Sequence, residues 1–477
     1  MSQMSKKMVC ISKAMDNFNK KIFPALIPDR QGIYIVGGSL RDAMLGHSPK
    51  DYDIVVRGDA RPVAEGIARQ AGSRVIPIGK PGLTTYRVIA GTHTLDIAPA
   101  EDGDLKKDLK RRDFTINAMA FDLHSETIHD PCSGLSDLKA GIVRMNSPAV
   151  LKADPLRLLR AFRMAAALGF QIAPETIAGI KKNAPAIKSV AKERVRDEWI
   201  KLLETPESFP HLLKMDDTGL MAALFPELQQ LKNCPQNDYH DLDAFDHTLQ
   251  VFRHLEQALT MNAPRLSHDH ANADLVNGPS GNALIKHTAL FHDIGKPAAA
   301  TTREDGKIRF YGHETTGAQM TEAISGRIGL SNAQKNYAAF IVRHHLRPLF
   351  LYTANSEGRR NALARTRFFI KTTPFTTDLL LLAAADMQGK RQNGDACGFK
   401  AFVRDTLEHY HKPFYPKYSA PPLVTGDDLI GRFGLTPSPL FAEILDKIEF
   451  QRLAGHIETR DKALAFVDNY IKSKMRP

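Results

Sequence analysis

Two aspartates one residue apart are the first side chains in this sequence that could do chemistry. Asp51 and Asp53 lie in the segment DYDIVV, whose apolar residues predict a strand; alternate side chains of a strand point to the same face. Two adjacent carboxylates repel each other unless cations hold them together, and oxygen ligands of this kind suit Mg²⁺. Gly37 and Gly38 follow the apolar run 33–36 and would let backbone N–H groups approach a phosphate. The pattern favours metal-assisted phosphoryl or nucleotidyl transfer, although a lone DxD is more often a solvated strand end.

A third carboxylate and a basic run could complete such a site. Asp96 lies inside an apolar strand segment, where a buried carboxylate is costly unless it is paired or metal-bound. Taken alone it is more simply a salt-bridged or edge-strand aspartate, but three carboxylates on neighbouring strands can hold two Mg²⁺ ions that activate a 3′-hydroxyl and stabilise pyrophosphate. The run KKDLKRRDFTINAMA contains Arg111, Arg112 and Asp113. Its guanidinium groups could grip a triphosphate and its aspartate could accept a ribose hydroxyl, with a solvated basic loop as the alternative.

A further segment, ADPLRLLRAFRMAAALGF at 153–170, is predicted to form one helix. In that helix Asp154, Arg157 and Arg160 are three residues apart on one broad face, and the leucines and phenylalanine between them are available for packing.

These segments together resemble the class II nucleotidyltransferases, the family of bacterial tRNA CCA-adding enzymes and poly(A) polymerases. GGSLRD, DYDIVV, RRDFTINAMA and the helix at 153–170 carry the resemblance in the family's order. The resemblance implies an α+β nucleotidyltransferase palm like that of DNA polymerase beta, followed by an all-α neck and body.

The same resemblance implies roles for individual residues. Arg41 and Asp42 would lie near the catalytic loop, and Asp113 would sense the ribose 2′-hydroxyl. Asp154 and Arg157 would hydrogen-bond the Watson–Crick edge of CTP or ATP, because cytosine and adenine both present an exocyclic amine there.

The chain departs from the family's EDxxR motif at one position, where Ala153 replaces the glutamate. That glutamate does not contact the base, so we expect activity to persist. Arg160 is included among the nucleotide-binding residues, and the segment ERVRDEW at 193–199 is expected to be a structural neck helix.

Histidines and aspartates in the second half of the chain predict a metal site. The order of these elements along the chain resembles the HD-type metal-dependent phosphohydrolases, and this resemblance implies His247, His292, Asp293 and Asp386 as the metal ligands. Imidazole and carboxylate ligands suit Mn²⁺, Fe, Ni²⁺, Co²⁺ or Zn²⁺, and bound metal would generate hydroxide for phosphoester hydrolysis.

Neighbouring residues extend this prediction. His313 and His344 (or His345) could bind a second metal or the substrate phosphate, and Lys296 could contact the phosphate. His287 and the loop histidines at 268–270 are predicted not to be ligands. The alternative is a degenerate helical domain that only holds RNA, which the full ligand set disfavours.

Composition narrows the class of protein. The 477 residues carry a formal net charge of +11, which points to a polyanionic partner such as nucleic acid. Four dispersed cysteines form no CxxC, which fits a reducing compartment. With no long apolar run and no signal-peptide pattern, we expect a cytoplasmic protein that needs no membrane and no obligatory protein partner.

The pattern along the chain predicts four parts: a palm at 1–150, a helical neck and body at 151–235, an HD domain at 236–410 and a helical tail at 411–477. Predicted strands are 33–36, 52–56, 86–89, 94–97 and 115–121, with a helix at 60–71. The composition at 233–241 marks a boundary, and the proline-rich segment 412–422 is expected to be a linker or extended cover.

The sequence therefore predicts an enzyme that adds nucleotides to an RNA 3′ end, with CTP and ATP as substrates, Mg²⁺ at the transfer site and a divalent transition metal at the HD site. The preferred substrate is tRNA receiving CCA, and the resemblance to bacterial CCA-adding enzymes with a fused HD domain implies phosphatase or 2′,3′-cyclic phosphodiesterase activity for that domain. Open alternatives are poly(A) synthesis, addition of CC or A alone, a nucleotide-signalling hydrolase, and a non-catalytic RNA-binding protein. In the family a flexible loop decides between these additions.

Overall fold

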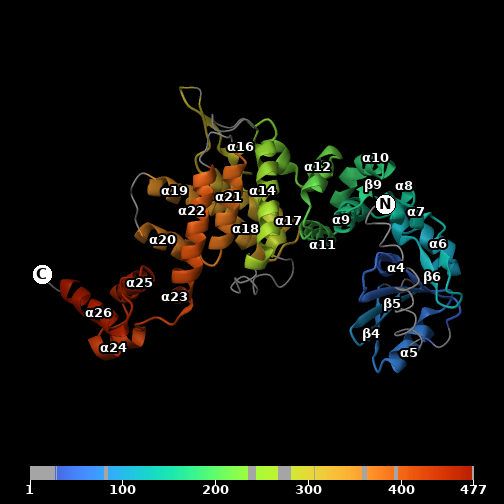
Figure 1. The fold of residues 1–477 in the computed structure, drawn as a ribbon, viewed down its shortest axis with the longest axis horizontal. Helices are drawn as coiled ribbons and strands as arrows, with labels where there is room; N and C mark the ends of the chain where they lie inside the picture. The colour runs from blue at the N-terminus through green and yellow to red at the C-terminus, as the bar shows by residue number, and fades with distance from the viewer. Residues whose placement is uncertain are drawn as a thin grey trace. The chain divides into compact units, whose positions relative to one another are not determined.

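The computed structural model describes residues 27, 30–79, 84–234, 243–266, 281–305, 307–356, 362–390 and 396–474. The chain divides into two compact units, Met1–Leu224 and Phe225–Pro477, which are coloured from blue to green and from green to red in Figure 1. Most of the predicted boundary at 233–241 lies outside the described residues, as do Cys10 and the histidines at 268–270.

The first unit begins with a seven-stranded mixed sheet in the order β3-β4-β5-β2-β1-β6-β7. The parallel neighbours are β2 and β5, and the other neighbours run antiparallel. The strands are β1 (Ile33–Val36), β2 (Asp51–Val56), β3 (Val75–Ile78), β4 (Thr85–Ala90), β5 (His93–Pro99), β6 (Ala120–Asp122) and β7 (Ile128–His129).

The two faces of this sheet differ in composition. One face carries Tyr52, Ile54, Leu95 and Ile97, all buried, and packs against helix α5 (Ala60–Gln70). Because side chains alternate along a strand, Asp51 and Asp53 lie on the opposite face. We call it the catalytic-carboxylate face after the role predicted for these two residues. Helix α6 (Leu105–Lys110) covers this face beside β1 and β6, through a core that includes Tyr34, Val36, Val55, Leu105 and Leu109.

The predicted strands agree with β1, β2, β4 and β5, but the prediction of a strand at 115–121 was wrong. Thr115–Asn117 forms a 3-10 helix, η3, and only Ala120–Asp122 joins the sheet. The Asp113 carboxylate accepts hydrogen bonds from the Phe114 N–H and the Asn117 side chain, at 2.8 and 2.9 Å. Such local side-chain bonds compete with a strand ladder.

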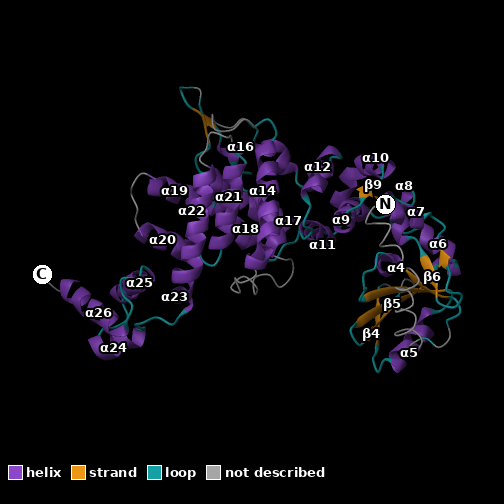
Figure 2. Cartoon of the chain, in the orientation of Figure 1, coloured by secondary structure: helices purple, strands orange, loops and turns teal. Residues whose placement is uncertain are grey.

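The rest of the first unit is mainly helical, as Figure 2 shows. The predicted helix at 153–170 is α9 (Leu156–Leu168), and Ala153 instead ends the preceding helix α8 (Pro148–Ala153). Asp154 between them is extended, with φ −142° and ψ 98°, because a residue before proline avoids the helical region. The other elements are the short pair β8 (Ile142–Val143) and β9 (Gln171–Ile172), α10 (Pro174–Asn183), η4 (Ala184–Ser189), α11 (Lys192–Leu203), α12 (Phe209–Asp217) and α13 (Leu220–Leu224).

The second unit contains a helical bundle. Helix α15 runs from Gly281 to Ala289, and a tight turn after it presents His292 and Asp293. A Cβ on Gly295 would lie 2.2 Å from the His313 carbonyl oxygen, so only glycine fits this close approach. The elements are η5 (Pro226–Leu231), α14 (Ala244–Leu266), α15 (Gly281–Ala289), α16 (Lys296–Ala299), β10 (Thr301–Thr302), β11 (Ile308–Arg309), α17 (His313–Arg327), α18 (Asn332–His344), α19 (Arg347–Ser356), α20 (Ala362–Thr372), α21 (Thr376–Gln388) and α22 (Ala396–His409).

The prediction of a linker at 412–422 was wrong over most of its length. A π-helical turn (Tyr410–Phe414) and α23 (Tyr415–Ser419) continue from α22. Tyr410 and Phe414 are buried against Phe369, with ring centroids 5.3 and 5.0 Å away, so aromatic packing outweighs the prolines. The predicted tail helices are α24 (Gly426–Phe433), α25 (Pro439–Leu453) and α26 (Arg460–Lys474), which share a core of their own.

Among the described helices, none is by itself long and apolar enough to cross a membrane. One pair, Ala362–Thr372 and Thr376–Gln388, passes that test when the two helices are counted together, but they meet at a bend of 108°.

Candidate functional site

Three carboxylates lie side by side on the catalytic-carboxylate face. The parallel pairing of β2 with β5 sets Asp53 opposite Asp96 and Asp51 opposite Thr94, and paired residues of neighbouring strands share a face. Protein atoms packed around the Asp53 carboxyl group desolvate it and raise its pKa, and the charges of Asp96 and Asp51 act in the same direction, against Arg112. This crowding of negative charge is what a bound cation would relieve.

Asp96 also has a strong partner within the sheet. Arg87 on β4 donates from Nε and Nη2 to its two carboxylate oxygens, at 2.7 and 2.8 Å. The pair is bidentate, the geometry in which guanidinium binds a carboxylate best. Of the three carboxylates, only Asp96 is thus paired with an arginine from a neighbouring described strand. Asp51 and Asp53 have no such ion pair within the described strands.

Gly37 brings the start of helix α4 (Gly37–Met44) directly against Asp53. Its φ is +73°, and a Cβ there would lie 2.8 Å from Asp53 Oδ2 and 3.0 Å from Arg112 Nη1. Gly38 follows with its nearest neighbour, the Arg41 guanidinium, 3.5 Å from such a Cβ. The predicted glycine pair thus borders both the carboxylates and a predicted phosphate-binding arginine.

The two predicted triphosphate-binding arginines share one buried anchor. Arg111 Nη2 lies 2.9 Å from Asp108 Oδ1, and Arg112 Nη2 lies 3.1 Å from Asp108 Oδ2. Asp108 is only 2% exposed, and it binds the Nε and Nη2 groups of both arginines. Sequence reasoning missed Asp108; the signal was an aspartate three and four residues before the two arginines, which directly follow helix α6.

A chain of hydrogen bonds connects α4 with α9. Arg41 Nη1 donates to Asn117 Oδ1 at 2.6 Å, Asn117 Nδ2 donates to Asp113 Oδ1 at 2.9 Å, and Arg160 Nη1 donates to Asp113 Oδ2 at 3.3 Å. Asp42 takes part through its bond from Arg41 Nε at 2.8 Å. The predicted sugar-sensing residue Asp113 is therefore held from both sides.

Arg160 lies in an internal ion network. Its Nε donates to the buried Glu198 at 3.0 Å, and Arg163 donates to the other Glu198 oxygen at 2.6 Å. Glu198 belongs to the neck helix α11, which agrees with the structural role predicted for 193–199. Arg160 thus connects α9 to Asp113 and to the neck.

Asp154 and Arg157, the predicted base-reading pair, both contact protein atoms. Arg194 of α11 bonds to both Asp154 oxygens, at 2.8 and 3.3 Å. Burial raises the pKa of Asp154, but the Arg194 ion pair outweighs it, so the pKa is lowered. Arg157 Nη1 donates to the carbonyls of Arg111 and Val150 at 3.1 and 3.2 Å. The involvement of Arg194 was not predicted from the sequence.

In the second unit, four buried histidines direct the same nitrogen atom toward one carboxylate. Each uses Nδ1 on a backbone carbonyl, at distances of 2.7–3.2 Å, and these histidines are His247, His292, His313 and His345. Their Nε2 atoms lie 3.7, 3.1, 3.3 and 3.7 Å from the Asp293 carboxylate. A histidine held through Nδ1 in this way has its tautomer fixed for binding metal through Nε2.

The two oxygens of Asp293 face different groups. Oδ2 faces His247, His292 and the Lys296 ammonium group, which is 2.7 Å away, whereas Oδ1 faces His313 and His345. Asp293 is therefore the one residue common to two possible metal-ligand groups, His247–His292–Asp293 and Asp293–His313–His345.

The structure places His345, not His344, in this cluster. His344 Nδ1 instead accepts from Arg347 at 2.9 Å, and burial together with nearby arginines lowers its pKa to about 4. Adjacent helical residues point about 100° apart, so only one can face Asp293. Burial lowers the pKa of His345 to about 3, which keeps its ring in the neutral, metal-binding form.

Asp386 completes the first group. Its Oδ1 lies 3.0 Å from His247 Nε2 and its Oδ2 lies 2.9 Å from Lys390 Nζ. Burial raises the pKa of both Asp293 and Asp386, but neighbouring lysines and histidines outweigh it and hold each pKa well below its usual range. Both carboxylates are thus ionised. The residue that sequence reasoning missed here is Lys390, one helical turn after Asp386.

This donor set fits a divalent metal. The buried His292 Nε2 atom lies 3.1 Å from Asp293 Oδ2 but forms no well-aligned hydrogen bond, which is costly unless something else binds its lone pair. Neutral imidazoles with ionised carboxylates are the ligands of Mn²⁺, Fe, Co²⁺, Ni²⁺ or Zn²⁺. The predicted non-ligand His287 lies apart, with Nε2 3.1 Å from Ser325 Oγ.

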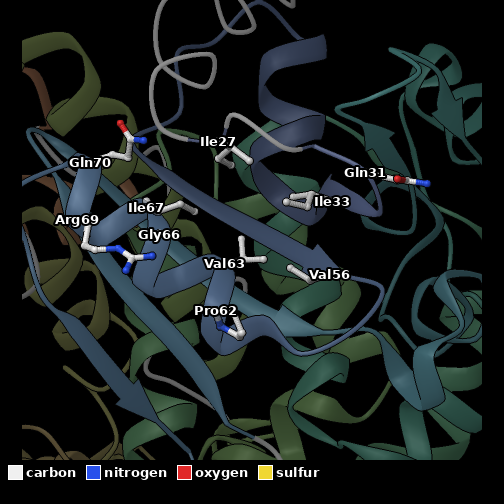
Figure 3. Close-up of a pocket in the computed structure, with 10 residues that line it drawn as sticks. All are labelled: Ile27, Gln31, Ile33, Val56, Pro62, Val63, Gly66, Ile67, Arg69 and Gln70. Atoms are coloured by element: carbon white, nitrogen blue, oxygen red, sulfur yellow. The ribbon is translucent and has the colours of Figure 1, made fainter.

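A cavity of about 690 Å³ lies on the opposite side of the sheet from the carboxylates. Figure 3 shows its lining, which comes from α5, the ends of β1 and β2, and Ile27. Ile33 pairs with Val56, whose side chain points to the face opposite that of Asp51 and Asp53, so this cavity is separate from the predicted transfer site.

Three family models match the chain in succession. They are described as the Poly A polymerase head domain (residues 33–144), the probable RNA and SrmB-binding site of polymerase A (169–232) and the HD domain (244–386). An A-adding tRNA nucleotidyltransferase of Deinococcus radiodurans is 31% identical over 94% of this chain and 97% of its own length. The chain belongs to the tRNA nucleotidyltransferase family.

Other members of the family differ in what their names say they add. A CC-adding tRNA nucleotidyltransferase of Thermus thermophilus is 29% identical over 93% of this chain and 94% of its own length. A multifunctional CCA protein of Pasteurella multocida is 32% identical over 75% of this chain and 84% of its own. The fold matches the Thermotoga maritima CCA-adding enzyme complexed with tRNA, with a TM-score of 0.65 at 21% identity over 98% of this chain and 99% of that one.

Replacing Gly37 with alanine should impair transfer. The new Cβ would push against Asp53 and Arg112, and displacements of this size in an active site cost about a hundredfold in rate. Gly46→Ala is the matched control, because Gly46 has φ +81° but nothing within 4 Å of its Cβ position. Nucleotide incorporation into tRNA should fall in Gly37→Ala and persist in Gly46→Ala; equal loss in both would show that backbone strain alone is responsible.

Stability should depend on pH through His287. Burial lowers its pKa to about 3 from an ordinary 6.5, so the neutral ring is fully stabilising above pH 6.5, and this contribution is lost as pH falls toward 3. The free energy of unfolding should fall by roughly 1.4 kcal/mol per pH unit from this group within that window.

Urea unfolding followed by circular dichroism at pH 7 and pH 5 would measure this dependence. His287→Gln should show a shallower acid loss than wild type, while His124→Gln, at an exposed position, should not. An unchanged slope in His287→Gln would contradict the assignment.

Proposed function

We propose that this protein adds cytidine and adenosine to the 3′ end of tRNA through the carboxylates on β2. The single observation that carries the proposal is the placement of Asp51 and Asp53 on one open face, beside Gly37 and the two anchored arginines, in a member of the tRNA nucleotidyltransferase family. Asp51 and Asp53 would hold Mg²⁺, with Asp96 in support. Bound Mg²⁺ supplies charge neutralisation at the α-phosphate and the pyrophosphate leaving group.

The protein's own groups would bind and orient the nucleotide. The Nη1 groups of Arg111 and Arg112 would donate to triphosphate oxygens, since Asp108 occupies Nε and Nη2 of both. Arg111 would exchange its ion pair with Glu101, 3.2 Å from Nη1, for the triphosphate. Asp113 would accept a hydrogen bond from the ribose. The hydrogen bonds from Arg41 through Asn117 and Asp113 to Arg160 would hold Asp113, the ribose-binding residue, at a fixed position relative to helix α4.

Choice of nucleotide would depend on Asp154 and Arg157. A carboxylate can accept from the exocyclic amine of cytosine or adenine, and a guanidinium can donate to the adjacent ring nitrogen or carbonyl. Asp154 would share or exchange its bonds with Arg194 on binding a base. The extended backbone at Asp154, imposed by Pro155, leaves its carboxylate outside the regular helix turns.

Addition of only part of the CCA sequence is a second candidate. Two relatives that match over more than nine-tenths of this chain are named A-adding and CC-adding enzymes, whereas the multifunctional CCA protein matches over three-quarters. Both candidates use the same catalytic residues. Poly(A) synthesis is the third outcome that an assay must separate.

The second unit favours an additional activity, phosphoester hydrolysis at the HD centre. His247, His292, Asp386 and one Asp293 oxygen would hold one divalent metal, and the other Asp293 oxygen with His313 and His345 would hold a second. Bound metal would supply an activated water for hydrolysis. Lys296, 2.7 Å from Asp293, would orient a phosphate. RNA 3′ phosphates and 2′,3′-cyclic phosphates are the proposed substrates.

We propose the four-part division 1–150, 151–235, 236–410 and 411–477 as the functional organisation, in a protein of the cytoplasm. The first two parts would carry transfer and the third would carry hydrolysis.

An assay on tRNA with defined ends tests the transfer function. Transcripts lacking CCA, ending in C or ending in CC are incubated with CTP, ATP or both, and products are resolved at single-nucleotide resolution. We expect a stop after CCA. A stop after CC or addition of A only to CC ends would identify the second candidate, and a long adenosine ladder on unrelated RNA would exclude both.

The same assay tests the carboxylates. Asp53→Asn should abolish addition, whereas Asp59→Asn, at the N-cap of α5 where asparagine serves equally well, should retain it. Persistent addition in Asp53→Asn would refute the assignment.

Metal removal tests the HD centre. Treatment with EDTA followed by dialysis should abolish hydrolysis of an RNA with a 2′,3′-cyclic phosphate, and adding back Mn²⁺, Co²⁺, Ni²⁺ or Zn²⁺ should restore it. Asp293→Asn should remove hydrolysis and spare nucleotide addition, with Asp405→Asn, at a solvent-exposed position, as the control. Loss of both activities in a folded Asp293→Asn protein would contradict two independent sites.

A further inference from the structure

The part of the catalytic-carboxylate face on β3 and β4 is partly or fully exposed to solvent among the described residues. The register aligns Asp53, Asp96, Arg87 and Ile76 in one row across β2, β5, β4 and β3. These strands form the side of the sheet labelled β4 and β5 in Figure 1. The surface of β4 and β3 on this face is therefore continuous with the surface that carries Asp53 and Asp96.

This part of the face carries apolar side chains where solvent-facing strands usually carry polar ones. Ile89 is 50% exposed and Ile78 is 39% exposed. The register pairs Ile89 with Thr94, which is itself opposite Asp51, and pairs Ile78 with Thr85. Exposed isoleucines on an edge strand and its neighbour invite non-specific association, so a protein that keeps them gains from a partner that covers them.

Arg87 places a positive charge among these isoleucines. Its side chain is 43% exposed, although Nε and Nη2 hold Asp96. The remaining nitrogen, Nη1, is not used by that pair and carries two further N–H donors. The surface thus combines apolar contacts with a donor suited to a phosphate oxygen.

The position of this surface limits what could occupy it. The strand being extended must bring its 3′-hydroxyl to Asp51 and Asp53 on the same face, so its preceding nucleotides must lie within a few strand widths, each about 4.8 Å. A single-stranded RNA end has flat base faces that contact apolar groups and phosphates that accept from guanidinium.

We propose that Ile78, Arg87 and Ile89 form the seat of the last nucleotides of the RNA acceptor. The isoleucines pack against base or ribose faces, and Arg87 Nη1 donates to a phosphate while its other nitrogens keep Asp96 in place. This inference rests on the proposed transfer function and assigns residues that bind the acceptor rather than the incoming nucleotide.

Kinetics of isoleucine variants test the seat. Ile78→Thr and Ile89→Thr keep a β-branched side chain suited to a strand, and Ile430→Thr, at an isoleucine of α24 that is 48% exposed, is the matched control. The double variant should raise the KM for a tRNA minihelix ending in CC by about tenfold, the loss expected when partly buried isoleucine surface no longer contacts a ligand. The KM for ATP should be unchanged, and the control should match wild type.

Direct binding provides a readout independent of turnover. Fluorescence anisotropy with a minihelix ending in 3′-deoxycytidine should show the same weakening in the double variant. In Arg87→Gln, the slope of log affinity against log salt should become shallower by about 0.7, the value for one phosphate contact on a single strand. A merely structural Arg87 would leave this slope unchanged.

The outcomes separate this inference from the transfer function. If wild type adds no nucleotide to any tRNA end, the proposed function fails. If wild type is active and the double variant keeps the wild-type KM and affinity for RNA, the seat is refuted. It is also refuted if the KM for ATP rises instead, or if size-exclusion chromatography shows that the double variant changes only the association of the protein with itself.

Discussion

The parallel pairing of β2 with β5 is the constraint on which the transfer site depends. It sets Asp53 beside Asp96 and turns Asp51 to the same face, so negative charge accumulates where the sheet is open. Positively charged neighbouring side chains offset the repulsion between these carboxylates. Arg87 neutralises Asp96 from β4, Arg112 lies close to Asp53, and the glycine at position 37 lets that arginine and the carboxylate approach each other.

Arginine–carboxylate pairs also hold the helices of the first unit in place. Asp108 positions the two arginines at 111 and 112, Asp113 joins α9 to the catalytic loop, and Glu198 joins α9 to the neck. Each acceptor is buried, so removing one partner leaves a charge away from water. This explains how the helical segment with the proposed base-reading residues can keep a fixed distance from the carboxylates on the sheet.

In the HD centre too, positively charged or hydrogen-bonding side chains surround a few buried carboxylates, but here they are histidines and lysines rather than arginines. One carboxylate, Asp293, gathers four imidazoles that backbone carbonyls hold through Nδ1. Lysines at 296 and 390 stabilise the ionised carboxylates. Because the carbonyls fix the tautomers, the centre is pre-organised before any metal binds. The two sites thus each rely on a few acidic groups whose charge is balanced by positioned neighbours.

The sequence alone determined the residue types that carry the chemistry and the local elements with strong periodicity. The β1, β2, β4 and β5 strands and the tail helices followed from patterns within a few residues. The order of short motifs along the chain, and its resemblance to HD proteins, predicted most of the residues that the structure gathers around Asp293. Tertiary structure decided what local patterns do not contain. The choice of His345 over His344, the pairing of Asp154 with Arg194, and the pairing of Asp96 with Arg87 depend on helix rotation and strand register. The segments at 115–121 and 412–422 differ from their predictions because side-chain hydrogen bonds and buried rings, formed on folding, outweighed their intrinsic preferences.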